Sequence, residues 1–366
     1  MIQERSFAKG NGQSLDNHSN ILLIQLGDIG DVVLSTPAIR ALKQSFPKAR
    51  LVVAVRDKAA DLLIGCPWCD DVLPVRKAGG FWGELFGQIA LVLRLRGAGF
   101  DLAIDLRTGT RGAILARISG AARRLGFWAD SEPWWRNMLF TDLLRHDYRP
   151  EQHVIDYLLS LLEAYNVKVF NREPEIVVPE FARNEADILL KKIVSGGRSL
   201  VVLQPFSLWR YKELVKESYI ELCRWLVRER NVVVVISGTS QERRQAAEIA
   251  DIVGDGCYNF AGHTHLLLYA AMLMQSRLVI GVDSAGVHIA SAVGSPTVSI
   301  FGPSSPASWG PKGNRHLVVQ RRMPCVPCRM RGCNNSGISR CLEELPLEEV
   351  RAAIDRQLSL NCHHHS

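Results

Sequence analysis

The 366-residue sequence lacks several features that mark well-defined protein classes. No apolar run approaches the ~18 residues that a transmembrane helix needs, and the N-terminal segment has no apolar signal-peptide core. Dense basic blocks are absent, and 44 Lys and Arg against 37 Asp and Glu leave a net charge of only +7. Such a mild excess favours an anionic small substrate, a phosphorylated glycolipid or an acidic membrane surface over nucleic acid. We therefore expect a cytoplasmic protein, at most peripheral on the cytoplasmic face of the inner membrane.

Two common nucleotide-binding motifs are also missing. Nothing matches G-x-x-x-x-G-K-[ST], which argues against a P-loop NTPase. The glycine-bracketed turn Gly27-Asp-Ile-Gly-Asp31 lacks the full G-x-G-x-x-G spacing, which weakens the case for a dehydrogenase.

The cysteines are few and mostly scattered, but four of the nine lie close together in the sequence. These four are Cys325, Cys328, Cys333 and Cys341. Their spacing resembles that of zinc ligands, although the last interval is longer than usual. Either a structural metal or reduced, packed thiols would explain the cluster, since disulfides are rare in cytoplasmic proteins.

What the chain does have is a repeated alternation of short apolar strands and amphipathic helices, with a hydrophobic content of 47%. This alternation predicts parallel sheets with helices on both faces, and the length predicts two domains. We expect a flexible arm at 1–20, a first Rossmann-like domain at 21–178, a second at 179–345, and a terminal helix and tail at 346–366. The terminal helix is expected to pack on the first domain.

The most informative stretch lies in the second domain and reads as strand, tight turn, helix and strand. Leu278-Val-Ile-Gly-Val is a buried strand, and Asp283 and Ser284 are residue types that begin helices. The start of such a helix offers free N–H groups and a positive dipole end, which suit a diphosphate. Small residues at Ala285 and Gly286 would let a ligand approach the backbone. An ordinary crossover with capping residues explains the stretch equally well.

Charged residues follow strands in the first domain. Asp31 stands after Gly30 at the start of a helix, where its carboxylate could take a proton from an acceptor hydroxyl. It could equally be a helix cap, and Asp28 is a competing carboxylate. Arg107 and Arg111 follow the strand at 102–106, at the edge where ligands bind in parallel sheets.

A basic loop follows the first strand of the second domain. Lys212 could neutralise a phosphate leaving group there, and Ser207 could add a hydrogen bond. A solvated loop without a ligand is the alternative.

An aromatic stretch at 127–149 looks irregular and carries nearby arginines. Trp134 and Trp135, together with Arg136 and Arg145, could touch a membrane or a lipid acceptor. Packing of the loop against the first domain is the alternative.

Taken together, these segments resemble glycosyltransferase family 9, the ADP-heptose:lipopolysaccharide heptosyltransferases. The resemblance runs from Ile21 to the terminal helix and rests on ordered motifs: Ile29-Gly-Asp-Val with Thr36-Pro-Ala-Ile, then Tyr211-Lys-Glu, then Gly281-Val-Asp-Ser-Ala-Gly-Val-His-Ile-Ala with Phe301-Gly-Pro. It implies a GT-B fold, with two Rossmann-like domains whose parallel sheets face a central cleft. It also implies an inverting enzyme that needs no metal and transfers heptose from ADP-heptose to a lipopolysaccharide inner-core acceptor.

The resemblance also implies roles for individual residues. Asp31 matches the catalytic base. In the same domain, Arg107 and Arg111 are expected to bind the acceptor glycan, because their charge suits anionic sugars or phosphates. The matches to donor contacts are Ser207, Lys212, Glu242, Asp283, Ser284, Ala285, Gly286 and His288. The sequence departs from the family at Leu208, where a hydroxyl residue is common, and at Ala285, where glycine is common; both bear on the identity of the donor.

Two other functions are compatible with the same architecture. A nucleotide-sugar epimerase would release a new sugar without an acceptor, and a non-catalytic nucleotide-sugar-binding protein would turn nothing over. The presence of both Asp31 and Lys212 argues against the second, because a binding protein needs no base.

Overall fold

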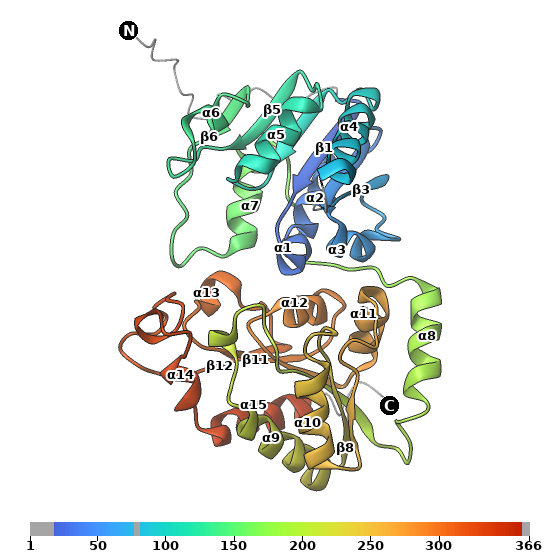
Figure 1. The fold of residues 1–366 in the computed structure, drawn as a ribbon, viewed down its shortest axis with the longest axis vertical. Coiled ribbons are helices and arrows are strands. Elements are labelled where there is room, and N and C mark those ends of the chain that lie inside the picture. Colours follow the sequence, from blue (N-terminus) through green and yellow to red (C-terminus); the bar gives the residue numbers. More distant parts are fainter. Residues whose placement is uncertain (1–17, 77–80, 361–366) are drawn as a thin grey trace. The chain divides into compact units, whose positions relative to one another are not determined.

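The computed structural model describes residues 18–76 and 81–360, and it divides into two compact units, Met1–Val177 and Val178–Ser366 (Figure 1). Most of the arm predicted at 1–20 and the end of the tail at 361–366 lie outside the described residues. Each unit is an α/β fold built on one parallel sheet. The predicted fold class, GT-B with two Rossmann-like units, is confirmed.

The first unit contains a six-stranded parallel sheet in the order β3-β2-β1-β4-β5-β6. Its strands are β1 (Asn20–Gln25), β2 (Arg50–Arg56), β3 (Asp71–Val75), β4 (Leu102–Asp105), β5 (Arg123–Phe127) and β6 (Asp142–Leu144). The chain builds outward from β1 in one direction and then, from β4, in the other. The central strands read as apolar runs because helices cover both faces of such a sheet.

The helices of the first unit follow the strands as crossovers. They are α1 (Ile29–Leu34), α2 (Thr36–Ser45), α3 (Asp57–Ala60), the short 3-10 helix η1 (Asp61–Leu63), α4 (Phe81–Gly97), α5 (Thr110–Ile118), α6 (Trp134–Asn137) and α7 (Val154–Glu163). Helix α2 begins with Pro37 in its first turn, where proline costs no hydrogen bond. It ends at Ser45, two residues before Pro47, because the residue that precedes a proline disfavours helical backbone angles.

The second unit repeats the first in strand order. Its six parallel strands run β12-β11-β10-β7-β8-β9, which is the order of the first sheet read from its other edge. They are β7 (Ser199–Gln204), β8 (Val232–Ile236), β9 (Cys257–Asn259), β10 (Leu278–Val282), β11 (Thr297–Phe301) and β12 (His316–Gln320). This order is typical of dinucleotide-binding folds, so both halves of the chain are doubly wound.

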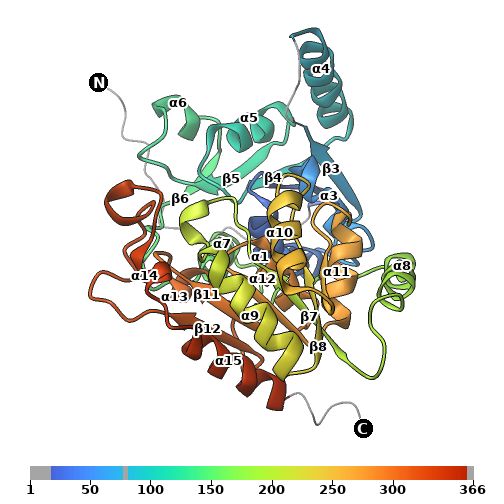
Figure 2. The same ribbon diagram turned by 60° about the horizontal axis from the view of Figure 1, so that its bottom comes forward.

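Helices cover this second sheet as well (Figure 2). They are α8 (Glu180–Leu190), the 3-10 helix η2 (Arg210–Lys212), α9 (Lys216–Glu229), α10 (Arg243–Val253), α11 (Leu266–Gln275), α12 (Ala285–Ala292), α13 (Pro306–Trp309), the 3-10 helix η3 (Cys333–Asn335), α14 (Arg340–Glu343) and α15 (Leu347–Leu360).

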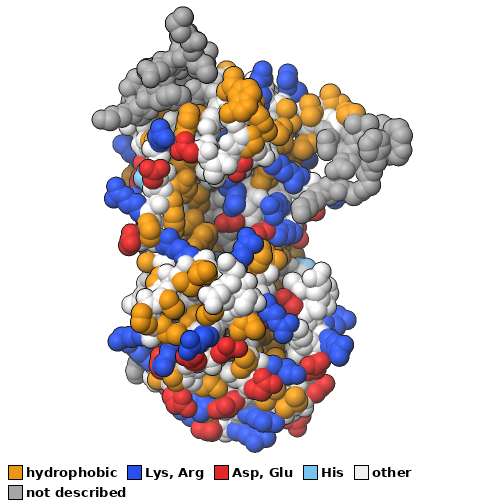
Figure 3. All heavy atoms as spheres, turned by 60° about the vertical axis from the view of Figure 1, so that its left-hand side comes forward, with side chains coloured by type: hydrophobic (Ala, Val, Ile, Leu, Met, Phe, Trp, Pro, Cys, Tyr) orange, Lys and Arg blue, Asp and Glu red, His pale blue; other side chains and the backbone are white. Residues whose placement is uncertain are grey.

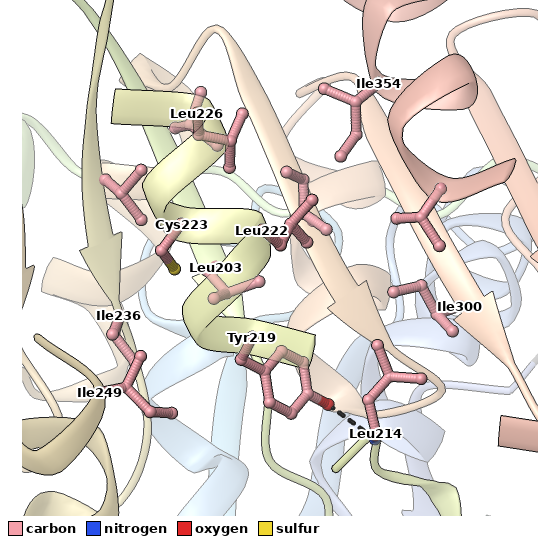
Figure 4. Close-up of a cluster of buried hydrophobic side chains, with 14 of the residues drawn as sticks. Leu203, Leu214, Tyr219, Leu222, Cys223, Leu226, Ile236, Ile249, Ile300 and Ile354 are labelled. Carbon is pink, nitrogen blue, oxygen red and sulfur yellow. Dashed lines mark hydrogen bonds between the residues drawn. The ribbon is translucent and has the colours of Figure 1, made fainter. Parts of the chain in front are cut away.

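The terminal helix α15 belongs to the core of the second unit, not to the first domain as predicted from the sequence. Its Val350 and Ile354 are fully buried in a cluster with Leu222 of α9 and Ile300 of β11 (Figure 4). Arg230 adds an ion pair to Asp355 at 2.6 Å. The apolar stripe of α15 was visible in the sequence, but an amphipathic stripe does not say which sheet will cover it.

Several short elements were not predicted. Strands β5 and β6 lie partly in the stretch at 127–149 that looked irregular, and α8, β9 and β12 were missed. The segment 174–179, at the boundary between the two units, is not a strand. Strands β6 and β9 have three residues each, too few for a hydrophobic period to show.

The surface carries no single block of charge on the face shown in Figure 3, where acidic and basic side chains are interspersed. Across the described residues, no helix is both long enough and apolar enough to cross a membrane.

Candidate functional site

The predicted site residues cluster at one kind of position in each sheet. In doubly wound sheets, ligands bind outside the carboxyl ends of the strands where the strand order reverses. That point lies between β1 and β4 in the first unit and between β7 and β10 in the second. The loops that follow these four strands carry most of the charged residues singled out from the sequence.

In the first unit, Asp31 is held by two hydrogen bonds. Its Oδ2 accepts from the backbone N–H of Asp28 at 2.8 Å and from Nη1 of Arg107 at 2.9 Å. The Asp31 side chain is 18% exposed, whereas that of Arg107 is 45% exposed. Asp31 is therefore both a capping residue of α1 and a carboxylate open to a ligand, so the two interpretations of the sequence are compatible.

Strand pairing explains why Asp31 meets Arg107. Residue Ile24 of β1 pairs with Asp105 of β4, so the loops that leave the two strands emerge side by side. Gly27 makes the close approach possible: a Cβ at Gly27 would lie 2.3 Å from Oδ2 of Asp31 and 2.6 Å from Nη1 of Arg107. Only glycine fits at this turn.

The backbone of Arg107 is itself clamped by a buried pair that the sequence analysis missed. Asp105 accepts from the Arg107 N–H at 3.1 Å, and Nη2 of Arg136 donates to the Arg107 carbonyl at 2.9 Å. The two clamping side chains lie 3.9 Å apart and are 1% and 0% exposed. Burial raises the pKa of Asp105 to about 7, against the Arg107 N–H and the charges of Arg136 and Arg107. The sequence does contain one signal for this buried pair, namely a carboxylate at the end of a fully apolar strand.

This arrangement corrects the interpretation of the aromatic stretch. Arg136 is fully buried and bonds to the carbonyl of Phe127 and to Oδ1 of Asn137, so it cannot touch a membrane. Arg145 lies over the ring of Trp128. Trp134 remains 77% exposed.

Asp28, the competing carboxylate, has a different environment. Its Oδ1 accepts from Nζ of Lys58 at 2.6 Å and from Nη1 of Arg56 at 2.9 Å. Burial acts to raise the pKa of Asp28, but the Lys58 hydrogen bond and the charges of Lys58, Arg56 and Arg107 outweigh it and lower that pKa. Asp28 is thus tied to two cations, which makes it a poor proton acceptor.

Arg111, the other predicted acceptor contact, lies in the first turn of α5. It is exposed, and its Nη2 donates to the carbonyl of Arg76 at 2.6 Å.

In the second unit, Lys212 and Asp283 form the central pair. Nζ of Lys212 donates to Oδ2 of Asp283 at 2.6 Å, and the Ser304 hydroxyl donates to the same oxygen at 2.5 Å. Asp283 is 5% exposed, whereas the Lys212 side chain is 20% exposed. The buried Asp283 carboxylate therefore orients the Lys212 side chain. Ser304, which helps to hold that carboxylate, was not predicted from the sequence.

The loop that carries Lys212 is anchored at both ends by one buried hydroxyl. Tyr219 donates to the carbonyl of Pro205 at 2.8 Å and accepts from the N–H of Leu214 at 3.0 Å (Figure 4). Tyr219 is 3% exposed and lies in the first turns of α9. It fixes the segment between β7 and α9.

Ser207 lies in this loop and is also oriented by neighbours. Its N–H donates to Oε1 of Glu213 at 2.8 Å, and its hydroxyl accepts from the N–H of Trp209 at 3.2 Å. Burial raises the pKa of Glu213, the Ser207 N–H opposes the shift, and the charge of Glu242 adds to it.

Glu242 stands at the start of α10, after β8. Its Oε2 accepts from the N–H of Thr239 at 2.6 Å and from the Thr239 hydroxyl at 3.0 Å. The carboxylate thus closes the turn that precedes α10.

The start of α12 combines an available polar group with tight packing. The Ser284 hydroxyl is buried without a hydrogen-bond partner among the described residues. Gly286 has no room for a side chain, since a Cβ would lie 2.6 Å from the Tyr269 hydroxyl and 2.8 Å from Cγ of Gln204. Packing against β7 thus gives a second reason for this glycine. Ala285 is half-buried, and His288 is 5% exposed within the same helix.

The four clustered cysteines were the candidates for a structural metal site. Within residues 18–76 and 81–360, no group of three or more His, Cys, Asp or Glu side chains is placed to hold a metal ion. Cys341 is buried on α14, whereas Cys325 is exposed. Burial raises the pKa of Cys341 to about 11, and the charges of Cys328, Cys333 and Cys325 add to the rise. The prediction of a structural metal has no support.

Two doubly wound units, each with charged residues at its switch point, make up the GT-B class of fold. The sequence model of "Glycosyltransferase family 9 (heptosyltransferase)" matches residues 89–339, which is more than half of the chain. The chain belongs to this family and is a glycosyltransferase.

Individual relatives agree with this assignment. The chain is 26% identical to the lipopolysaccharide heptosyltransferase 3 of Escherichia coli strain K12 over 302 residues, 77% of this chain and 82% of that protein. A family 9 glycosyltransferase from Veillonella parvula superposes with a TM-score of 0.80 at 20% identity, covering 96% of this chain and 99% of that one. The E. coli heptosyltransferase WaaC, solved with ADP-2-deoxy-2-fluoro heptose, gives 0.69 at 18% identity, with 92% and 99% covered. The similarity to these two solved structures supports the assignment of the fold alone.

Proposed function

We propose that this enzyme transfers heptose from ADP-heptose to an inner-core acceptor of lipopolysaccharide, with inversion at the anomeric carbon and Asp31 as general base. The observation that carries the proposal is the carboxylate of Asp31 at the switch point of the first sheet, oriented by Arg107 and by the N–H of Asp28. Curated relatives named as lipopolysaccharide heptosyltransferases support the substrate class. A related structure that holds a fluorinated ADP-heptose supports the donor.

Asp31 has the geometry that a general base needs. Both of its hydrogen bonds end on Oδ2, so we assign Oδ1 as the atom that takes the proton of the acceptor hydroxyl. The acceptor oxygen then attacks the anomeric carbon as the bond to the ADP oxygen breaks. Arg107 keeps the carboxylate aimed, and, with Arg111, it supplies positive charge for phosphates or acidic sugars of the acceptor.

The second unit supplies the groups that a diphosphate needs. The ammonium of Lys212 has three N–H donors, and Asp283 takes one of them, so the remaining donors can reach phosphate oxygens. The unpartnered Ser284 hydroxyl and the N–H groups that begin α12, at Ala285 and Gly286, add donors at a positive dipole end. These groups stabilise the charge that develops on departing ADP, and the mechanism uses no cofactor.

Four further residues complete the proposed donor site. Ser207 and Glu242 lie in the loops after β7 and β8, where a nucleotide lies in doubly wound folds, and Asp283 and His288 flank the diphosphate segment. We place the reaction on the cytoplasmic side, where a peripheral contact of the first unit would present the lipid-linked acceptor.

The test is a transfer assay with ADP-heptose, with and without a core-oligosaccharide acceptor, that follows ADP release and product mass. Asp31→Asn should lower turnover by about 10²–10⁴-fold, the usual contribution of a general base, and leave ADP binding unchanged. Asp28→Asn is the matched control, since it removes a neighbouring carboxylate and should keep transfer. Full turnover by Asp31→Asn would exclude the base. A new free sugar formed without acceptor would indicate an epimerase instead.

A further inference from the structure

A pair of cysteines in the first unit has no place in the transfer reaction. Cys66 and Cys69 flank a turn made by Pro67 and Trp68, between η1 and β3. Both thiols are free and half-buried, so small solutes can reach them. The spacing Cys-x-x-Cys is the one in which thiol pairs exchange with disulfides.

The two thiols are hydrogen-bonded to each other, and the contact differentiates them. The bond from the Cys69 thiol lowers the pKa of Cys66 to about 7; burial opposes this shift, and the N–H groups of Trp68 and Cys69, which also point at the Cys66 sulfur, add to it. The same bond raises the pKa of Cys69, and burial and the charges of Asp70 and Asp71 add to that rise. Cys66 is thus the attacking thiolate of the pair, and Cys69 the thiol that resolves.

The surrounding turn is compatible with a short covalent bridge. The ends of a β-turn lie within about 7 Å, which overlaps the range of about 4.4–6.8 Å between the Cα atoms of a disulfide. The turn is held on both sides: the Cys66 N–H donates to Leu63 at 3.1 Å, and the Asp70 N–H donates to Leu51 at 2.9 Å. Lys43 fixes the Asp70 carboxylate at 2.7 Å.

We propose that Cys66 and Cys69 form a reversible dithiol–disulfide site that exchanges with low-molecular-weight disulfides. The Cys66 thiolate attacks one sulfur of the small disulfide, and the other sulfur leaves as a thiolate. Cys69 then loses its proton and attacks the Cys66 sulfur, which releases the second small thiol. The cysteine pair is oxidised by two electrons, and one small disulfide is reduced to two thiols.

Trp68 connects the site to the end of the first unit. Its indole Nε1 donates to Oε2 of Glu175 at 3.4 Å, and Arg40 donates to the same oxygen at 2.7 Å. The Glu175 N–H in turn donates to the Thr36 hydroxyl at 3.0 Å. These hydrogen bonds link the turn to Glu175, close to the end of the first unit.

The chain contains its own control. Cys223 and Cys257 are also hydrogen-bonded to each other, but they are 0% and 7% exposed inside the second unit. Burial and the partner thiol raise the pKa of Cys223. A thiol pair without access and without a stabilised thiolate should stay reduced in the same experiment.

The experiment treats the full-length protein with glutathione disulfide at neutral pH, quenches with acid, alkylates and digests with trypsin. Trypsin cleaves after Lys58 and Arg76, so both cysteines are found in one tryptic peptide, residues 59–76. We expect this peptide to lose two hydrogen atoms without a glutathione adduct and to regain them with dithiothreitol. Cys223 and Cys257 should remain alkylated throughout.

Two single variants separate the roles of the thiols. Cys69→Ser should trap one glutathione on Cys66, whereas Cys66→Ser should accumulate little adduct. A shift of two pKa units raises the thiolate fraction at neutral pH about 50-fold and lowers its nucleophilicity about tenfold, so Cys66 should react about fivefold faster than an unperturbed thiol. Free thiols in the wild-type peptide, or a persistent adduct there, would overturn the proposal.

Discussion

The buried carboxyl of Asp105 leads to a quantitative prediction about stability. Asp105 is 1% exposed, and burial raises its pKa to about 7 from its ordinary value of 3.8. The unfolded chain leaves the group at its ordinary pKa, so between these two values only the unfolded state ionises. Over this pH range the unfolded state therefore binds fewer protons at Asp105 than the folded state does. The contribution of Asp105 to the free energy of unfolding must then fall as pH rises.

The size of the effect follows from the two pKa values. For a group that titrates near 3.8 when unfolded and near 7 when folded, the free energy of unfolding falls by about 2 kcal/mol from about pH 5 to about pH 7. Asp105→Asn keeps the shape of the side chain and cannot ionise, so the variant lacks this dependence. Its offset from the wild type depends on how Arg136 packs against the amide that replaces the carboxyl, but the slope of the difference does not.

The assay is urea unfolding of the wild type and Asp105→Asn at several pH values between about 5 and about 7.5. The two units can unfold separately, so the transition that includes the first unit is the one to compare. Asp130→Asn is the control, since Asp130 is 67% exposed and its curve should run parallel to that of the wild type. Parallel curves for wild type and Asp105→Asn would refute the reasoning, because the folded state would then bind no extra proton at Asp105.

Three further changes test the site. Gly27→Ala should lower turnover without unfolding the protein, because a Cβ would lie 2.3 Å from Oδ2 of Asp31. Gly109→Ala is the control: a Cβ there meets no atom within 4 Å, so turnover in the same assay should be kept. Tyr219→Phe should lower the free energy of unfolding by about 2–4 kcal/mol, since it leaves two buried backbone groups unpaired, and calorimetry or denaturant titration would measure the loss. Lys212→Met should weaken ADP binding in calorimetry by about 1.5–3 kcal/mol, the usual contribution of a hydrogen bond to a charged group, and unchanged affinity would exclude the lysine from the donor site.

Sequence alone was sufficient for the class of fold and for most central elements. The apolar runs of β1, β7 and β10 are local signals, because a strand buried on both faces must be apolar along its whole length. The ordered motifs then indicated glycosyltransferase family 9, and the family comparison confirms it. Short edge strands such as β6 and β9 escaped, since their neighbours in the sheet, not their own residues, make them strands.

Which side chains meet was decided by the tertiary structure. Asp31 and Arg107 are 76 positions apart and Lys212 and Asp283 are 71 apart, and each pair meets because the strands before them are neighbours in a sheet. The sequence identifies each of these residues as a candidate, but local sequence patterns do not reveal which strands are neighbours in the sheet. The tertiary structure also decided the environment of Asp105. Burial within the first unit raises the pKa of this carboxyl, which looks ordinary in the sequence.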